Sequence, residues 1–442
     1  MTISQPRLSV IDLFAGCGGL SLGLEQAGFT PVFVNELNSD ALETYIRNRE
    51  HLHAHLRDEG FRTNDVKSMV LNPRYLTSLN KRLLTTFGIG KGEVDLVVGG
   101  PPCQGYSGIG HRRSYSVDKE QLPSNHLFED MAYIIHRVQP RAFVFENVRG
   151  LLNAKWTSTG RKGEIFEDVR RRFADLRGYR VTYSLVFAKD YGVPQNRPRV
   201  LIVGVRDDIK VPGEVEDTRN PFDIKDAVRN GFLPKPSVDP APSIEDLLSD
   251  LVDPDYVPGV TEETSAYPHR AMSEVQKRLR ATQDGSKVRG KGDTVTEHQY
   301  SKHSAKIIAK FRAMLDDPNH EIPEQFRTKK FAQRVLPRRW SKEGPTITAT
   351  SLPDDYIHFE QPRSLTVREW ARLQMFPDWY QFAGKRTTGG IRRAGNPREG
   401  IFDREVPKYT QIGNAVPVKL AREVGLHLAT ILNGQSREPR SS

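Results

Sequence analysis

Short apolar runs alternate with segments of helical periodicity through the first half of the chain. The apolar runs predict strands, at residues 8–14, 30–36, 94–99, 142–148, 180–188 and 199–205. Apolar residues at helical spacing predict helices, at residues 20–27, 38–48, 127–138 and 163–176. Residues 51–92 are less regular. The alternation predicts an α/β protein with a doubly wound, mostly parallel, Rossmann-like sheet.

The regular alternation stops after Arg206, where prolines become frequent, and we expect a domain boundary there. Helical spacing returns in a few segments, at residues 301–315, 366–375 and 417–433. Thr366 and Glu369 have the spacing of a capping box, which predicts the start of the second of these helices. Residues 436–442 are expected to form a disordered tail.

Charge divides the region after Arg206 into two halves of opposite sign. Residues 207–263 hold 15 acidic and 5 basic side chains, whereas residues 264–342 hold 18 basic and 8 acidic ones. A nucleic-acid backbone would repel the first half and could lie along the second. The whole chain carries a net charge of +10, which also fits a polyanionic partner.

Composition narrows the class of protein. Hydrophobic residues make up 37% of the chain and charged residues 27%, as in soluble globular proteins. No stretch approaches the roughly 20 apolar residues of a membrane span, and residues 1–7 lack the apolar core of a signal peptide. Two cysteines cannot make a disulfide framework or a Cys-rich zinc site. We expect a cytoplasmic protein without a metal site or a membrane partner.

A glycine turn at residues 15–19 separates the first predicted strand from the first helix, and the next strand ends in Glu36. Such a unit binds nucleotides in doubly wound sheets, with the acid on the ribose. Ser21 stands where a dinucleotide fingerprint has its third glycine, so a nucleoside without phosphates is favoured. Asp65 could face the adenine edge, and Cys17 is interpreted as packing material.

A second turn, GGPPCQGYS at residues 99–107, follows the strand at 94–99. Two prolines fix the backbone before Cys103, which is either a small buried residue or a positioned nucleophile. Glu146 ends another apolar strand and is either a site carboxylate or the partner of an arginine. Arg197 and Arg199 alternate at a strand start, where they could bind an anion or an oxygen-bearing base, or face water. The loop at 104–125 is long enough to be a functional flap.

Together these segments resemble the cytosine-C5 DNA methyltransferase family. The resemblance rests on motifs in the family's order: DLFAGCGG at 12–19, PPCQ at 101–104, ENV at 146–148, QNRPR at 195–199, residues 363–377, and GNAVP at 413–417. It implies a catalytic domain that binds S-adenosyl-L-methionine at 1–206, an inserted target-recognition domain at 207–337, and a segment at 338–435 that completes the catalytic domain. Duplex DNA would lie between the domains.

The resemblance also implies roles for single residues. Cys103 would add to cytosine C6, because C5 is a poor nucleophile until the ring is activated. Glu146 would protonate or hydrogen-bond N3 of the base, which has been flipped out of the duplex. Arg199 would stabilise O2, and Arg197 would orient the backbone around it. The expected cofactor residues are Phe14, Ala15, Gly16, Gly18, Gly19, Glu36, Leu37, Asp65, Pro101 and Asn414.

Other functions remain open at this point. An RNA (tRNA) cytosine-C5 methyltransferase of the same family would share the catalytic residues, and a non-catalytic nucleic-acid-binding relative would share the fold. A nicotinamide oxidoreductase is disfavoured by Ser21 and by the Pro-Pro-Cys turn. The preferred hypothesis is a monomeric bacterial modification enzyme, associated with the nucleoid and accompanied by a restriction endonuclease. Its DNA sequence would be read by residues between about 269 and 339.

Overall fold

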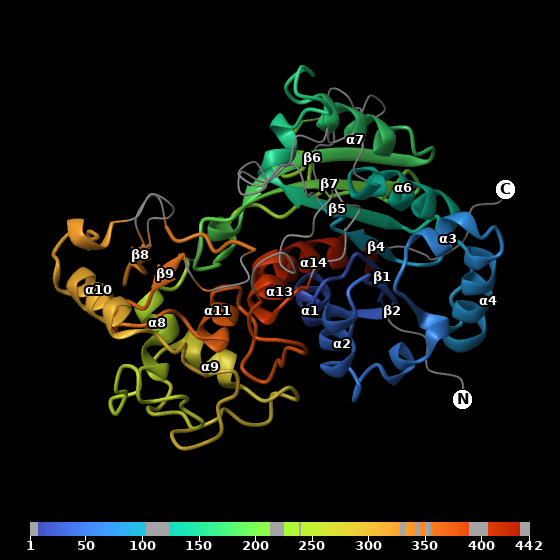
Figure 1. Ribbon diagram of the computed structural model, residues 1–442. Helices are drawn as coiled ribbons and strands as arrows, with labels where there is room; N and C mark the ends of the chain where they lie inside the picture. The colour runs from blue at the N-terminus through green and yellow to red at the C-terminus, as the bar shows by residue number, and fades with distance from the viewer. Residues whose placement is uncertain are drawn as a thin grey trace.

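A seven-stranded sheet is the centre of the protein (Figure 1). The computed structural model describes residues 8–102, 123–212, 225–237, 240–327, 333–340, 344–349, 353, 355–388 and 405–433. The strand order is β3-β2-β1-β4-β5-β7-β6. The strands are β1 (Leu8–Leu13), β2 (Phe29–Asn35), β3 (Arg62–Thr63), β4 (Leu96–Gly99), β5 (Ala142–Val148), β6 (Tyr179–Phe187) and β7 (Pro198–Arg206).

The predicted doubly wound, mostly parallel sheet is confirmed. Strands β3, β2, β1, β4 and β5 pair in parallel, and only β7 runs antiparallel to its two neighbours, β5 and β6. The strand order reverses direction between β1 and β4. In open α/β sheets this switch point opens a crevice beyond the carboxyl ends of the strands, where ligands bind.

Helices cover both faces of the sheet, because successive side chains of each buried strand point to opposite faces. Val10, Val98 and Val144 belong to one core with α1 (Gly19–Gln26) and α14 (Val418–Asn433). Residues next to them in sequence, such as Ile11 and Phe143, belong to a second core. The helices of that face are α4 (Tyr75–Phe87), α6 (Leu127–Val138) and α7 (Glu164–Ala174).

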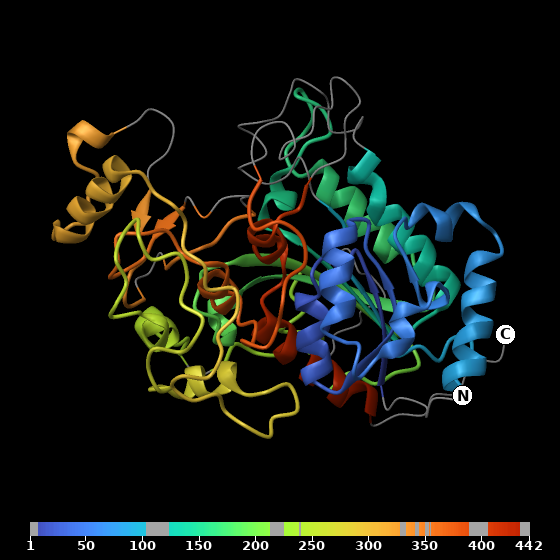
Figure 2. The ribbon, with the colours of Figure 1, turned by 60° about the horizontal axis from the view of Figure 1, so that its bottom comes forward.

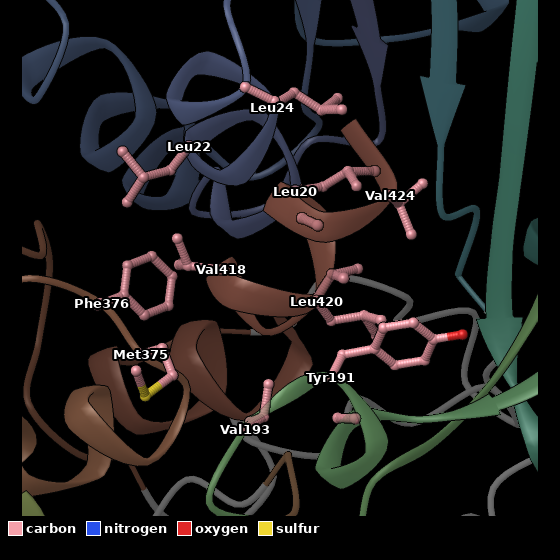
Figure 3. Packing of buried hydrophobic residues seen from close by; sticks show 14 of the residues in the cluster. Leu20, Leu22, Leu24, Tyr191, Val193, Met375, Phe376, Val418, Leu420 and Val424 are labelled. Carbon is pink, nitrogen blue, oxygen red and sulfur yellow. The ribbon is translucent and has the colours of Figure 1, made fainter. Parts of the chain in front are cut away.

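Figure 3 shows the first core at close range, with leucines of α1 facing Val418, Leu420 and Val424 of α14. The two helices approach so closely that a Cβ on Gly23 of α1 would lie 2.4 Å from the carbonyl oxygen of Val418. The C-terminal helix therefore completes the domain that the N-terminal strand begins.

Two helices lie where the sequence showed no regular pattern. The less regular stretch at 51–92 contains α3 (Lys67–Leu71) and α4, which were not predicted, although four buried residues of α4 (Leu76, Leu79, Leu83 and Phe87) follow a helical period. Helix α13 (Lys408–Asn414) was also not predicted. The helices that were predicted are all present, α2 (Ser39–Arg47) among them. The predicted capping box of Thr366 and Glu369 begins α11 (Val367–Leu373).

A smaller region stands beside the sheet and contains α8 (Ile244–Leu248), α9 (Glu274–Arg280), α10 (Ala305–Asp316) and the two-stranded sheet of β8 (Arg334–Val335) and β9 (Tyr356–Ile357). Figures 1 and 2 both place α10 at its outer end, away from the main sheet. Beyond Arg206 the chain still contacts the main sheet, since Ala227 donates its N–H to the carbonyl oxygen of Tyr183 in β6 at 3.0 Å, an ordinary hydrogen-bond distance. Among the described residues, no helix is long and apolar enough to cross a bilayer.

A buried ion pair joins the sheet to the last helix. Arg141 donates to Asp95 at 2.7 Å and to the carbonyl oxygen of Leu432 in α14 at 2.8 Å. The other oxygen of Asp95 accepts from the backbone N–H and the hydroxyl of Ser9 in β1. Residues from the beginning, the middle and the end of the chain therefore share one polar cluster.

We expect Arg141→Ala to lower the free energy of unfolding by about 3–5 kcal/mol, because it leaves the buried Asp95 carboxylate without its cation. Urea unfolding measures this change. Arg161→Ala is the matched control, since Arg161 forms an exposed ion pair with Glu167 at 2.5 Å and should change stability far less than Arg141→Ala. Equal, small losses in the two variants would contradict the prediction.

Candidate active site

The two turns singled out in the sequence leave the sheet side by side. Leu13, the last residue of β1, is paired in register with Gly99, the last residue of β4. Gly99 is paired in turn with Phe145, one residue before Glu146. The glycine turn, the Pro-Pro turn and Glu146 therefore meet at the carboxyl edge of the sheet, at its switch point. Cys103 and residues up to 122 lie outside the described residues.

The glycine turn is held open by the carboxylate of Glu36, which follows β2. One carboxylate oxygen of Glu36 accepts the N–H of Gly16 at 2.8 Å, and the other accepts the N–H of Asn38 at 2.8 Å. Phe14 has a φ of 56°, a left-handed conformation that is rare outside glycine. The side chain of Asn35 accepts the N–H of Phe14 at 3.3 Å and supports this conformation.

The glycines of the turn are required for different reasons. A Cβ on Gly16, which has a φ of 56°, would meet nothing within 4 Å, so open space lies beside its backbone. A Cβ on Gly18 would lie 2.8 Å from Arg49 and 2.9 Å from the hydroxyl of Tyr380. A Cβ on Gly19 would lie 2.5 Å from the carbonyl oxygen of Val416. Only Gly16 thus offers its backbone to a ligand, whereas Gly18 and Gly19 permit close packing within the protein.

Other predicted cofactor residues lie in the glycine turn, after strands β2 and β3, and at the end of α13. Ala15 donates its N–H to the carbonyl of Asn35 at 2.9 Å, which fixes the start of the turn. Leu37 follows Glu36 and is 75% exposed, an unusual position for a large apolar side chain. Asp65 is exposed and follows β3, next to β2, where its carboxylate accepts the N–H of Lys67. Asn414, the last residue of α13, is exposed.

Asp12 lies directly behind the glycine turn and is fully buried. Its carboxylate accepts the hydroxyl of Ser21 at 2.6 Å, and that hydroxyl lies 2.7 Å from the hydroxyl of Tyr45. Burial raises the pKa of Asp12 to about 7, against the smaller opposing effects of Ser21 and Arg49. Cys17 is also buried, which confirms its interpretation as packing material, and burial raises the pKa of its thiol to about 12.

The start of the Pro-Pro turn is anchored to the end of β5. Asn147 donates its side-chain amide to the carbonyl oxygen of Pro101 at 3.2 Å. A Cβ on Gly100 would lie 2.6 Å from a carboxylate oxygen of Glu146, so a glycine is needed for the turn to pass the carboxylate. Pro101 is buried and Pro102 is exposed. The backbone that leads to Cys103 therefore starts beside Glu146.

Glu146 and Arg199 form a buried ion pair, with Nε of the arginine 2.5 Å from a carboxylate oxygen. Burial raises the pKa of Glu146 above its ordinary value, although Arg199 and Arg197 oppose this shift. Register explains the pairing, because Glu146 in β5 is opposite Leu201 in antiparallel β7, close to the start of that strand. The arginine partner that the sequence allowed for Glu146 is thus present, and its role as a site carboxylate stays a prediction, with Glu146 at the edge where the turns meet.

Arg197 contacts a different part of the protein. Its guanidinium donates to the carbonyl oxygen of Ile347 at 2.8 Å and of Ala415 at 3.2 Å, and it also contacts the carbonyl of Gly413. Arg197 thereby ties the start of β7 to the C-terminal motif at 413–417. These contacts hold backbone carbonyl groups, and the role of Arg197 as a positioning residue in the site stays a prediction.

Charged residues of the motif at 363–377 belong to a buried network of ion pairs that was not predicted from the sequence. Arg372 donates to Asp250 at 2.5 Å and to Asp378 at 2.6 Å, and Arg280 donates to Asp250 at 3.1 Å. Arg363 makes a two-bond contact with Glu369. Asp250 of the acidic segment 207–263 is thus paired with Arg280 of the basic segment 264–342 and with Arg372 of the motif, a pairing that the net charges of the segments do not show.

The sheet order, with antiparallel β7 between β5 and β6, and the glycine turn at the switch point define a Rossmann-like methyltransferase. Residues 8–429 match the model of the C-5 cytosine-specific DNA methylase family. The chain belongs to this family and is a DNA (cytosine-5-)-methyltransferase.

Individual relatives cover nearly the whole chain. Type II methyltransferase M.DdeI of Desulfomicrobium norvegicum is 30% identical over 94% of this chain and 87% of its own length. Type II methyltransferase M.BspRI of Lysinibacillus sphaericus is 32% identical over 96% of this chain and 82% of its own length. A solved structure from an E. coli prophage, described as a DNA modification methyltransferase, shares the fold with a TM-score of 0.64 at 22% identity, over 96% of this chain and 99% of that one.

The raised pKa of Asp12 predicts a stability that depends on pH. The unfolded chain releases this proton near pH 3.8, whereas the folded protein holds it to about pH 7. The stabilisation is complete below about pH 4 and is lost as the pH rises toward 7. In urea unfolding, wild type should lose stability relative to Asp12→Asn by up to about 1.4 kcal/mol per pH unit over this range. If the free energies of unfolding of wild type and Asp12→Asn changed in parallel with pH, the prediction would be contradicted.

Proposed function

We propose that the protein transfers a methyl group from S-adenosyl-L-methionine to C5 of a flipped cytosine in a specific duplex DNA sequence, as the modification enzyme of a bacterial restriction-modification system. The register of β1 with β4 and of β4 with β5 carries the proposal, because it brings the glycine turn, the turn before Cys103 and Glu146 to one edge. The names of the relatives, which are type II methyltransferases, support the modification role.

The residues around the glycine turn fit S-adenosyl-L-methionine. The open space at Gly16 lets a ligand lie against the backbone, and Glu36 has carboxylate lone pairs beside it for ribose hydroxyls. The exposed side chain of Leu37 offers an apolar surface for an adenine ring, with Asp65 on the neighbouring strand end. When bound, this group supplies an electrophilic methyl group to the site.

The protein's own groups activate the cytosine. Cys103, as a thiolate, adds to C6, and the electron pair of the C5–C6 double bond moves toward C5 and the ring carbonyl. Glu146, whose pKa is raised by burial, gives a proton or a hydrogen bond to N3, and Arg199 stabilises the charge at O2. After C5 has gained the methyl group, a base removes the C5 proton, the bond to Cys103 breaks, and the aromatic ring is restored.

The basic half of the region after Arg206, residues 264–342, supplies the DNA contacts in this proposal. Extruding a cytosine costs roughly a few kcal/mol, which contacts to the surrounding duplex must offset. Arg280 of this half is already paired with the buried Asp250, so the DNA contacts come from exposed residues such as Lys291, Lys306 and Arg334. Residues 269–339 remain the segment proposed to read the sequence.

Bisulfite sequencing of DNA from cells that express the protein tests the function directly. We expect protected cytosines at one recurring sequence, which would also identify the recognition site. Cells that express no protein, or the Cys103→Ser variant, are the controls. Protection of transfer RNA without protection of DNA would instead support an RNA methyltransferase.

Cys103→Ser should lower the rate of methyl transfer by a factor of at least about 10³, because a hydroxyl is a far weaker nucleophile toward C6 than a thiolate. Transfer of labelled methyl groups to duplex DNA measures the activity. Calorimetry with S-adenosylhomocysteine should show cofactor binding close to that of wild type. Near-normal turnover in the variant would refute the assignment of Cys103.

Glu36→Ala should weaken cofactor binding first, because it removes both the ribose acceptor and the support of Gly16. We expect the dissociation constant of S-adenosylhomocysteine to rise by about tenfold or more, in line with the loss of hydrogen bonds to a charged group. Glu43→Ala is the control, since Glu43 lies in α2 and pairs with Arg57 on the surface. Equal affinities of the two variants would count against this cofactor site.

A further inference from the structure

Tyr380 packs against the glycine turn, where its hydroxyl would lie 2.9 Å from a Cβ on Gly18. It is fully buried, and its ring packs against Phe376 and Phe382 at centroid distances of 4.9 and 5.6 Å. The sequence analysis did not single it out, because it stands three residues beyond the motif at 363–377 and no local pattern connects it with residue 17.

The hydroxyl of Tyr380 contacts the backbone of the turn. It donates to the carbonyl oxygen of Cys17 at 2.6 Å and accepts from Arg49 at 3.0 Å. Arg49 also donates to the next carbonyl, that of Gly18, at 3.2 Å, and is held by Glu25. Two consecutive carbonyl groups of the turn are therefore bound from behind by Tyr380 and Arg49.

These contacts act on the shape of the turn. Residues 16 and 18 both have positive φ values, 56° and 86°, so the peptide groups between them are turned out of any regular structure. Arg49 and Tyr380 occupy the space that a Cβ on Gly18 would need. The Cys17 side chain is held as well, since its Sγ lies 3.3 Å from the carbonyl oxygen of Gln411.

The residues next to Tyr380 in sequence connect the glycine turn with the smaller region beside the sheet. Asp378, two residues earlier, accepts from the hydroxyl of Tyr267 at 2.6 Å and from Arg372. Gln381, the next residue, donates its N–H to the side chain of Asn48 at the end of α2. The segment from 378 to 381 is thus fixed at both ends, and the hydroxyl of Tyr380 has little freedom to move.

We propose that Tyr380 is a positioning residue for cofactor binding: its hydroxyl holds the Cys17 carbonyl so that the backbone of Gly16 faces the cofactor. The inference rests on the proposed function, and it deepens it by naming a residue outside the cofactor motif that determines cofactor affinity. Tyr380 itself touches neither cofactor nor base in this arrangement. It acts through the turn.

Tyr380→Phe tests the inference, because it removes only the hydroxyl and keeps the ring. We expect the dissociation constant of S-adenosylhomocysteine, measured by calorimetry, to rise about fivefold, the effect of one net hydrogen bond. In the methylation assay on plasmid DNA that bears the protected sequence, the KM for S-adenosyl-L-methionine should rise by the same factor. The KM for DNA and the kcat at saturating cofactor should stay within about twofold.

Tyr409→Phe is the matched control. Tyr409 is also fully buried, and its hydroxyl donates at 2.8 Å to a backbone carbonyl outside the glycine turn, that of Leu365. Thermal unfolding should show similar losses for both variants, whereas only Tyr380→Phe should lose cofactor affinity. Unchanged affinity in Tyr380→Phe, or an equal loss in both variants, would overturn the inference alone. Failure of wild type to bind S-adenosylhomocysteine would overturn the proposed function and the inference with it.

Discussion

The parallel pairing of β1 with β4 is the constraint on which the site depends. Because Leu13 and Gly99 are partners in register, the turns that follow them start next to each other at the same edge. A shift of one residue would turn every side chain of the strand to the other face and exchange the two cores. Buried apolar side chains on both faces therefore fix the register, and the register places the glycine turn beside the turn that leads to Cys103.

At the same edge, several residues of each motif contact other parts of the protein. Gly16 faces open space, but Gly18 makes room for Arg49 and Tyr380, and Gly19 makes room for the backbone of Val416. Arg197 holds carbonyl groups, whereas Arg199 faces Glu146. In this protein, much of each motif stabilises the backbone around the site, and a smaller part is left for chemistry.

The strands and most helices could be predicted, because period and turn residues are local signals. Buried strands at 94–99 and 142–148 stand out as apolar runs, and the cap of Thr366 and Glu369 marks a helix start. Helix α4 was not predicted, although four of its apolar residues, Leu76, Leu79, Leu83 and Phe87, have helical spacing, because the segments around it are less regular. Helix α13 is only seven residues long, too short for a helical period to stand out in the sequence.

By itself, the sequence determined the fold class, the order of the elements and the residue types available for chemistry, because these follow from local spacing and from motifs in a given order. The tertiary structure decided which of these residues meet. It placed Glu146 against Arg199, gave Gly18 and Gly19 packing roles, and brought Tyr380 behind Cys17, 363 positions away in the chain. Contacts of this kind depend on strand register and helix packing over long separations, and no local pattern encodes them.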